Sequence, residues 1–251
     1  MKHLVVSAVA VLALTGVASA AEIALIAPGG IRAALEDLVP KFEQQTGHKV
    51  KMTIGSGGGT KQQVIKGEPF DVPVVQLPLE PVLASGHVVT ASETPLAHVS
   101  VGIAVRTGQP RPDVSTADKV KQLLLNAKSI SYPNPAGGAA AGFSFNDTMA
   151  KLGITDQMKP KIKLAQGGRG AMELLAKGDV DIGLTFVSEI ITEPGVEAVG
   201  ALPRDISEPT VLIGFLSAHA KDPEAAKALL AFLSGPTAAA VYKARGMEPG
   251  R

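Results

Sequence analysis

Short apolar runs alternate with amphipathic segments along most of the chain, and this alternation predicts strands that are followed by helices. The first apolar run, from Ile23 to Ala27, is typical of a buried parallel strand, and it ends at Pro28-Gly29-Gly30. Behind it, apolar side chains recur at the helical period from Leu35 to Phe42, and Gly47 is a plausible end of this helix. Pro40 lies inside that segment, so we expect a bend or a break there.

The same rhythm continues to the end of the chain. Further strands are predicted over residues 49–54, 71–75, 99–105, 129–132, 162–164, 182–186 and 211–216. Further helices are predicted over residues 61–66, 79–84, 115–125, 143–152, 166–177, 223–233 and 237–244. Pro73 cannot donate to a strand ladder, which favours an edge or strand-end position for it. The pattern predicts an α/β fold with mostly parallel sheets. The polar loop at 106–113 is the candidate crossing into a second lobe, and the strand at 211–216 returns to the first.

Glycine-rich junctions between a strand and a helix recur along the chain. They lie at Gly29-Gly30, Gly55 to Gly59, Gly137-Gly138 and Gly167-Gly168. Glycine lets the backbone approach a ligand closely, and the first N–H groups of a helix are unpaired and favour an anion. In the second junction, Ser56 and Thr60 add hydroxyl groups. A tight turn is the alternative explanation for one such run. However, ligand sites of α/β proteins lie beyond the carboxyl ends of the strands, where these glycines fall.

The N-terminus carries the features of a secretory signal peptide over residues 1–20. Lys2 and His3 precede an apolar run over residues 4–14, and Ala18-Ser19-Ala20 provides an A-x-A cleavage site. The apolar run is too short to span a bilayer, so we expect a soluble, periplasmic protein that starts near Ala21 and is not embedded in a membrane.

Charge and composition exclude several classes of function. Loss of Lys2 with the signal peptide lowers the formal net charge from +1 to 0, and this neutral balance argues against nucleic acid as a partner. The chain has no cysteine, which excludes disulfides, thiolate metal sites and a cysteine nucleophile. His48, His87, His98 and His219 are scattered without metal-ligand spacing, so we expect no metal and no cofactor.

Catalytic motifs are incomplete. Thr60 stands where a P-loop needs its second glycine, and no dinucleotide-binding glycine pattern fits at Gly55. Residues 142–146 fall one glycine short of a nucleophile elbow, and Asp179 and Asp181 look like a loop-to-strand pair. We therefore expect a protein that is not an enzyme and has no catalytic residues. An exported hydrolase and a secreted binding module without a transporter stay open as alternatives.

Ordered sequence segments resemble those of the periplasmic molybdate-binding proteins of ABC importers, which belong to the type 2 periplasmic solute-binding superfamily. The segments are residues 27–35, 42–47, 54–58, 67–72, 140–143, 169–183 and 223–233, and they extend over nearly all of the mature chain. The last of them recurs across many extracellular solute-binding proteins, so it identifies the superfamily better than the ligand. The resemblance implies a two-lobed α/β periplasmic binding protein fold of type 2, with the ligand in the interlobe cleft. We expect the first lobe over residues 21–101 and 213–251 and the second over 102–212.

The same resemblance implies an oxyanion held by serine hydroxyls, backbone N–H groups and a tyrosine hydroxyl. The matching positions are Gly30, Ser56-Gly57, Ala141, Gly168 and Phe186, so three expected hydroxyls are replaced, at Gly30, Gly57 and Phe186. Burying an oxyanion without donors to replace its hydration is costly. Glycine for serine also enlarges the cleft, so an organic acid fits these substitutions at least as well as molybdate.

Other candidates for ligand contact have structural alternatives. Arg169 would pair with a carboxylate, or it serves only as a structural residue near the start of a helix. Tyr132 and Asn134 are hypothetical selectors, although Tyr132 is equally well explained by packing. The candidate ligand-binding residues are Gly29, Gly30, Ser56, Gly57, Gly58, Tyr132, Ala141, Gly168, Arg169 and Phe186.

We therefore expect a monomeric periplasmic receptor that closes its lobes on a small anionic ligand and delivers it to an ABC transporter permease. The sequence leaves open whether the ligand is molybdate, tungstate, another oxyanion or an organic acid, and it does not name the permease.

Overall fold

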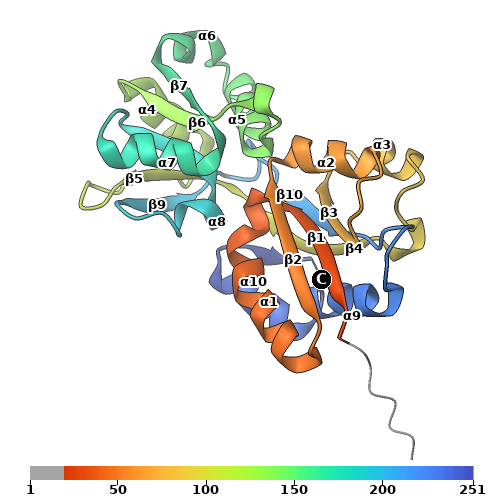
Figure 1. Cartoon of the computed structure of the whole chain (residues 1–251). Coiled ribbons are helices and arrows are strands. Elements are labelled where there is room, and N and C mark those ends of the chain that lie inside the picture. The colour runs from red at the N-terminus through yellow and green to blue at the C-terminus, as the bar shows by residue number, and fades with distance from the viewer. Residues whose placement is uncertain (1–19, 251) are drawn as a thin grey trace, which may run out of the picture.

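A computed structural model describes residues 20–250 and shows two α/β lobes, each built on one sheet (Figure 1). The predicted signal peptide lies, except for Ala20, outside the described residues. Within the described residues, no single helix has the length and apolar character needed to cross a membrane. Two consecutive helices, α9 (Pro223–Leu233) and α10 (Pro236–Ala244), meet that test only as a pair, and they are bent by 51°.

The sheet of the first lobe has the strand order β11-β4-β10-β3-β1-β2. Its strands are β1 (Glu22–Pro28), β2 (Lys49–Gly55), β3 (Val72–Gln76), β4 (Thr94–Val99), β10 (Thr210–Gly214) and β11 (Glu248–Pro249). The sheet of the second lobe has the order β7-β6-β8-β5-β9. Its strands are β5 (Val101–Arg106), β6 (Ile130–Pro133), β7 (Ile162–Ala165), β8 (Ile182–Phe186) and β9 (Val196–Ala201). The chain passes between the sheets at Ser100 and again between β9 and β10.

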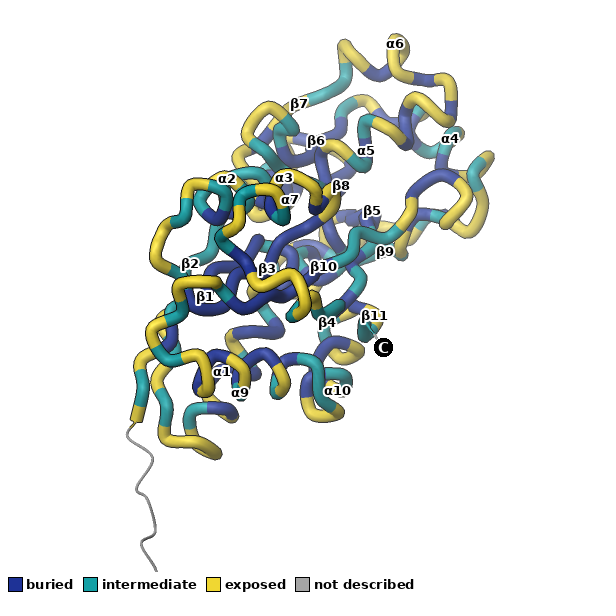
Figure 2. The backbone as a smooth tube through the Cα atoms, turned by 90° about the vertical axis from the view of Figure 1, so that its right-hand side faces the viewer, coloured by how far each residue is buried: buried dark blue, intermediate teal, exposed yellow. Residues whose placement is uncertain are grey.

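Helices cover the two sheets. Those of the first lobe are α1 (Arg32–Thr46), α2 (Gly57–Ile65), α3 (Glu80–Ala84), α9 and α10. Those of the second lobe are α4 (Ala117–Asn126), α5 (Ala140–Lys151), α6 (Thr155–Met158), α7 (Gly167–Lys177) and α8 (Val187–Ile190). Figure 2 shows inner strands such as β1 and β3 buried in the middle of the molecule, whereas the helices are exposed along their outer sides. The central strand β1 carries Leu25 and Ile26, both fully buried.

The prediction of mostly parallel sheets is wrong. Only the pairs β1–β2, β1–β3, β6–β7 and β6–β8 are parallel among the described strands, whereas β10 and β5 pair antiparallel with their neighbours on both sides. Parallel neighbours need a crossover connection, usually a helix, and most of the parallel pairs have one. The antiparallel pairs involve the strands that lie next to the two lobe crossings. The fold class, a two-lobed α/β protein, is confirmed.

Two proline predictions and one strand prediction need correction. α1 continues through Pro40, so the break is wrong, whereas the bend stays a prediction. Pro40 is exposed to solvent, where water can satisfy the carbonyl group that loses its donor. Pro73 is the second residue of β3, an internal strand, so the edge position is wrong and the strand-end position is right. The apolar run at 99–105 is not one strand: Val99 ends β4, and residues 101–105 form most of β5, which belongs to the other sheet.

Candidate functional site

A cleft of about 920 Å³ lies between the lobes, and all four glycine-rich junctions contribute to its walls. The first two junctions, at Gly29-Gly30 and Gly55 to Gly57, come from the first lobe, where β1 and β2 end. Gly137 and Gly167-Gly168 come from the second lobe, after β6 and β7. The site therefore lies beyond the carboxyl ends of parallel strands, as in other open α/β sheets.

Two helices of the second lobe begin at the cleft without a capping side chain. These are α5, which follows Ala139, and α7, which follows Gln166. Free N–H groups at the start of a helix, together with its dipole, favour an anion. The start of α2 differs, because the Ser56 hydroxyl accepts a hydrogen bond from the Gly59 N–H at 3.1 Å. There, the Gly58 N–H donates to the Gly138 carbonyl of the opposite lobe at 2.9 Å.

Most of the candidate residues from the sequence line the cleft. They are Gly29, Gly30, Ser56, Gly57, Ala141, Gly168, Arg169 and Phe186. Asn134 lines it too, with its side chain accepting from the Ala136 N–H. Gly58 instead lines an adjoining cavity. Tyr132 lies apart from all of these, in the core of the second lobe, where its hydroxyl donates to Asn146 at 2.8 Å and burial raises its pKa. Contact with a ligand stays a prediction for each residue.

Larger side chains occupy the space beside three of the glycines. A Cβ atom on Gly30 would lie 2.9 Å from the Phe186 ring, and one on Gly57 would overlap the side-chain oxygen of Gln76. A Cβ atom on Gly168 would overlap the carboxyl group of Glu189. The expectation that glycine in place of serine enlarges the cleft is therefore wrong at Gly30 and Gly57. A phenyl ring, an amide and a carboxyl group fill the space that side chains there would need.

The Glu189 carboxyl group is the least expected feature of the cleft. Glu189 is the third residue of α8, lines the cleft and accepts a hydrogen bond from the Thr185 hydroxyl. Burial raises its pKa above the ordinary value, and the nearby carboxylate of Glu193 acts in the same direction. The Thr185 hydroxyl and the Phe186 backbone N–H oppose this rise. A raised pKa increases the share of the protonated carboxyl group, which donates a hydrogen bond instead of repelling an anion.

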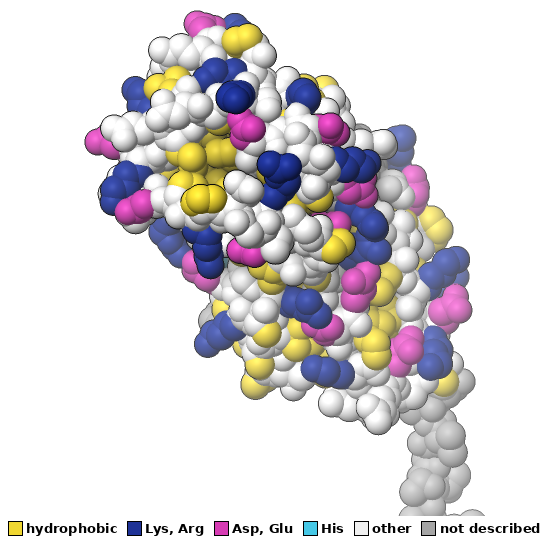
Figure 3. All heavy atoms as spheres, turned by 90° about the vertical axis from the view of Figure 1, so that its left-hand side faces the viewer, with side chains coloured by type: hydrophobic (Ala, Val, Ile, Leu, Met, Phe, Trp, Pro, Cys, Tyr) yellow, Lys and Arg dark blue, Asp and Glu magenta, His cyan; other side chains and the backbone are white. Residues whose placement is uncertain are grey.

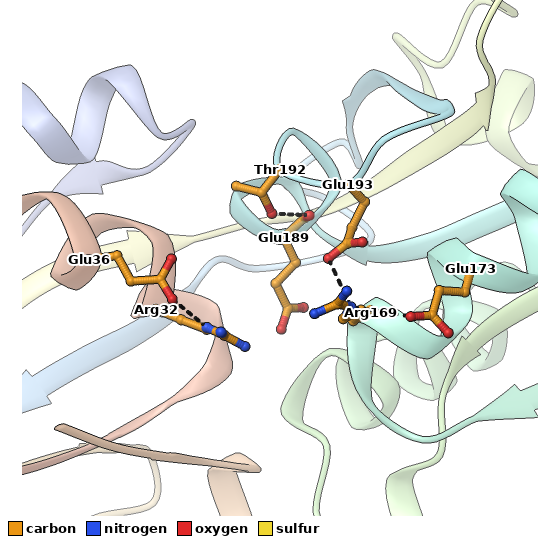
Figure 4. Close-up of polar contacts among 7 residues, drawn as sticks. All are labelled: Arg32, Glu36, Arg169, Glu173, Glu189, Thr192 and Glu193. Atoms are coloured by element: carbon orange, nitrogen blue, oxygen red, sulfur yellow. Dashed lines mark hydrogen bonds and ion pairs between the residues drawn. The ribbon is translucent and has the colours of Figure 1, made fainter.

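Two arginines extend toward this carboxyl group from opposite lobes, Arg32 from α1 and Arg169 from α7 (Figure 4). Arg32 Nε lies 2.7 Å from Glu36 Oε1. Arg169 Nε lies 3.2 Å from Glu173 Oε1 and 3.8 Å from Glu193 Oε1. Ion pairs as exposed as these contribute about 0–1 kcal/mol, so a ligand carboxylate can replace them at little cost.

Elsewhere the surface carries both signs of charge. Lys and Arg side chains are interspersed with Asp and Glu over the face shown in Figure 3. Exposed ion pairs also form within helices, such as Lys227 with Glu224 at 2.7 Å. Because surface charges of opposite sign offset one another at a distance, the arginines of the cleft act on a ligand at short range.

The sequence did not single out Arg32, Gln76 or Glu189 as candidates. Arg32 was part of a resembling segment, and Gln76 directly follows a predicted strand. Glu189 lies three residues after the end of the predicted strand 182–186. This position could have identified it as a site residue, because ligands bind beyond such strand ends.

Two α/β lobes that enclose a polar cleft, joined by two passages of the chain, define the class of solute-binding proteins. The chain belongs to the bacterial extracellular solute-binding protein family, whose model matches residues 23–248. The resemblance to molybdate-binding proteins is confirmed by two comparisons. The Azotobacter vinelandii molybdate-binding protein ModA is 27% identical, over 91% of this chain and 90% of that protein. The solved structure of the Azotobacter vinelandii periplasmic molybdate-binding protein superposes with a TM-score of 0.76, at 22% identity, over 91% of this chain and 100% of that chain.

An enzyme is also among the relatives. An aconitate isomerase from Pseudomonas sp. is 28% identical to this chain, over 90% of this chain and 87% of that protein. Family membership therefore identifies a solute-binding fold, but the names of the relatives give different functions for proteins with that fold.

Proposed function

We propose that this chain is a monomeric periplasmic receptor of an ABC importer and that it captures an organic acid with at least two carboxylates. The observation that carries this proposal is the placement of Glu189 between Arg32 and Arg169 in a cleft of about 920 Å³. The two guanidinium groups each match a carboxylate in planar geometry, and they come from opposite lobes. A ligand with two carboxylates would bridge the lobes.

A molybdate-type oxyanion is the second candidate, and the relatives named for molybdate favour it. The donor set of the cleft weighs against it. A tetrahedral dianion needs a dense shell of donors, but glycine occupies two of the expected hydroxyl positions, and Phe186 occupies the third.

Lobe closure would couple capture to transport. The lobes already touch beside the cleft, where the Gly58 N–H donates to the Gly138 carbonyl and Ser188 Oγ donates to the Gly30 carbonyl. A ligand that contacts both lobes favours the closed arrangement by its difference in affinity for the two arrangements. The permease would then recognise the closed form.

Thermal unfolding of the chain from Ala21 onward tests the ligand class. The panel contains molybdate, tungstate, sulfate, phosphate and mono-, di- and tricarboxylic acids, including cis- and trans-aconitate. A ligand at one hundred times its Kd stabilises the fold by about 2.7 kcal/mol. We expect di- or tricarboxylates to raise the Tm, and Arg169→Gln and Arg32→Gln to weaken this effect. Lys227→Gln, which removes an exposed charge on α9, is the control. Stabilisation by oxyanions alone would overturn the carboxylate proposal.

An isomerase of an unsaturated polycarboxylic acid such as aconitate is a separate candidate. It is favoured by the relative named aconitate isomerase and by the presence of a proton-accepting group in the cleft. Incubation with cis-aconitate, followed by chromatography for the trans isomer, tests it directly.

A further inference from the structure

The three glutamates that line the cleft differ in the groups that contact their carboxyl oxygens. Glu36 contacts Arg32 and Glu193 contacts Arg169, so each of these two carboxyl groups has a guanidinium partner. Glu189 is held instead by neutral donors, the hydroxyl of Thr185 and a backbone N–H group. Burial raises the pKa of this carboxyl group, which favours its protonated form, and a carboxyl group can both accept and return a proton.

The carboxyl group of Glu189 also has a defined position. One oxygen lies beside Gly168 and accepts from Thr185, and the other lies 2.9 Å from the place of a Cβ atom on Gly29. Gly29 belongs to the first lobe and Gly168 to the second, so the carboxyl group stands where the two lobes meet over the cleft. Both glycines provide the room that this placement needs. An acid bound between the two arginines would lie next to it.

A structural role accounts for part of this arrangement. Glu189 is the third residue of α8 and interacts with the N–H of Phe186, the residue before the helix, as in a capping box. Capping uses one oxygen of the carboxyl group, and a solvent-exposed carboxyl group can provide that oxygen. It does not require the second oxygen to reach the opposite lobe.

We propose that Glu189 is a catalytic residue that moves a proton between two carbon atoms of an unsaturated polycarboxylic acid bound in the cleft. This inference rests on the proposed carboxylate ligand. In the first step, the ionised carboxyl group removes a proton from the carbon next to the double bond. The electron pair of that C–H bond forms a new double bond, and the original double bond shifts its electrons toward a ligand carboxylate.

In the second step, the protonated carboxyl group of Glu189 returns the proton to the far carbon of the three-carbon unit. The double bond has then moved by one position, and the substrate and product contain the same atoms and electrons. Arg32 and Arg169 would stabilise the negative charge that develops on the ligand carboxylates. Phe186 contributes an apolar wall, and Thr185 acts as a positioning residue because it fixes the carboxyl group without touching the ligand.

Proton NMR in D₂O tests the proposal with trans-aconitate and cis-aconitate as probes. We expect the chain from Ala21 onward to incorporate deuterium into the ligand methylene group and to interconvert the two isomers. Glu189→Gln keeps the shape of the side chain and its capping hydrogen bond, and it should lower the exchange rate by about 100-fold or more. Its affinity for the probes, measured by calorimetry, should change far less. Glu224→Gln, on the exposed side of α9, should exchange at the rate of the unchanged chain.

Further variants separate catalysis from folding. Glu189→Asp retains a carboxyl group at a shorter reach and should recover part of the exchange that Glu189→Gln loses. Thr185→Val removes a donor that lowers the pKa of Glu189, so the pH profile of exchange should move to higher pH. Binding of aconitate without any exchange, or undiminished exchange in folded Glu189→Gln, would overturn this inference and leave the receptor proposal intact. Absence of carboxylate binding would instead overturn both.

Discussion

The Ser188 hydroxyl donates a hydrogen bond of 2.7 Å to the Gly30 carbonyl, and this bond joins the second lobe to the first beside the cleft. Ser188 is 2% exposed, and the residue after it is Glu189. This buried contact therefore links the closure of the lobes to the position of α8 and to the placement of the cleft carboxyl group.

Ser188→Ala should loosen this link. The variant leaves the Gly30 carbonyl without its donor, and an unsatisfied buried acceptor costs about 1–3 kcal/mol. We expect a lower Tm and, because closure is less favourable, a ligand affinity reduced by about five- to tenfold. Calorimetry with the stabilising ligand measures both effects. Ser234→Ala removes an exposed hydroxyl contact at the end of α9 and should alter neither. Equal affinity in Ser188→Ala and the unchanged chain would show that the bond does not contribute to closure.

Gly30→Ser introduces the hydroxyl that the resemblance to molybdate-binding proteins implies at this position, yet it should destabilise this chain. The added Cβ atom would lie 2.9 Å from the Phe186 ring, and overpacking of a buried site costs about 1–3 kcal/mol. Phe186→Ala removes the opposing ring, so the double variant should be more stable than the sum of the single effects predicts. Denaturant unfolding of all four proteins gives the coupling free energy. A coupling near zero would contradict the contact.

Much of the fold was predictable because short-range signals decide it. Asp222-Pro223 predicted the start of α9, and the structure shows Asp222 accepting from the Ala225 N–H at 3.0 Å. The predicted strand at 182–186 coincides with β8, since its apolar run ends where α8 begins. The division at Ser100 was not predictable from hydrophobicity, because the strands on both sides of it are largely buried.

The sequence predicted the location of the candidate site better than it predicted the contacts within the site. Strand ends and glycines located the cleft, whereas the groups that fill it come from other elements. Gln76 and Phe186 are far in sequence from Gly57 and Gly30, the glycines that they face, and no local pattern pairs them. Glu189 reaches the cleft only because the short helix α8, which the sequence did not predict, turns the chain there.

Gly142→Ala should be among the most destabilising small substitutions in the second lobe. Gly142 lies in α5, and its Cβ atom would overlap the Pro133 carbonyl oxygen, a backbone atom that has little freedom to move. We expect a loss of at least 2 kcal/mol in the free energy of unfolding, in the range of severe overpacking. Gly137→Ala is the matched control, because a Cβ atom there meets no atom within 4 Å. Similar stability of the two variants in urea would refute the predicted overlap.

The raised pKa of Glu189 predicts how stability depends on pH. A carboxyl group with a higher pKa in the folded state favours folding most below its unfolded pKa, and this contribution is lost as the pH rises through the folded pKa. Glu189→Gln removes the group that must ionise beside Glu193 in the partly buried cleft, while Arg169 and Arg32 remain. The variant should therefore gain stability relative to the unchanged chain between pH 4 and pH 8. Thermal unfolding without ligand at both pH values measures this gain, with Glu224→Gln as the exposed control. A difference in Tm between Glu189→Gln and the unchanged chain that stays constant from pH 4 to pH 8 would mean that Glu189 ionises as easily in the fold as in the unfolded chain.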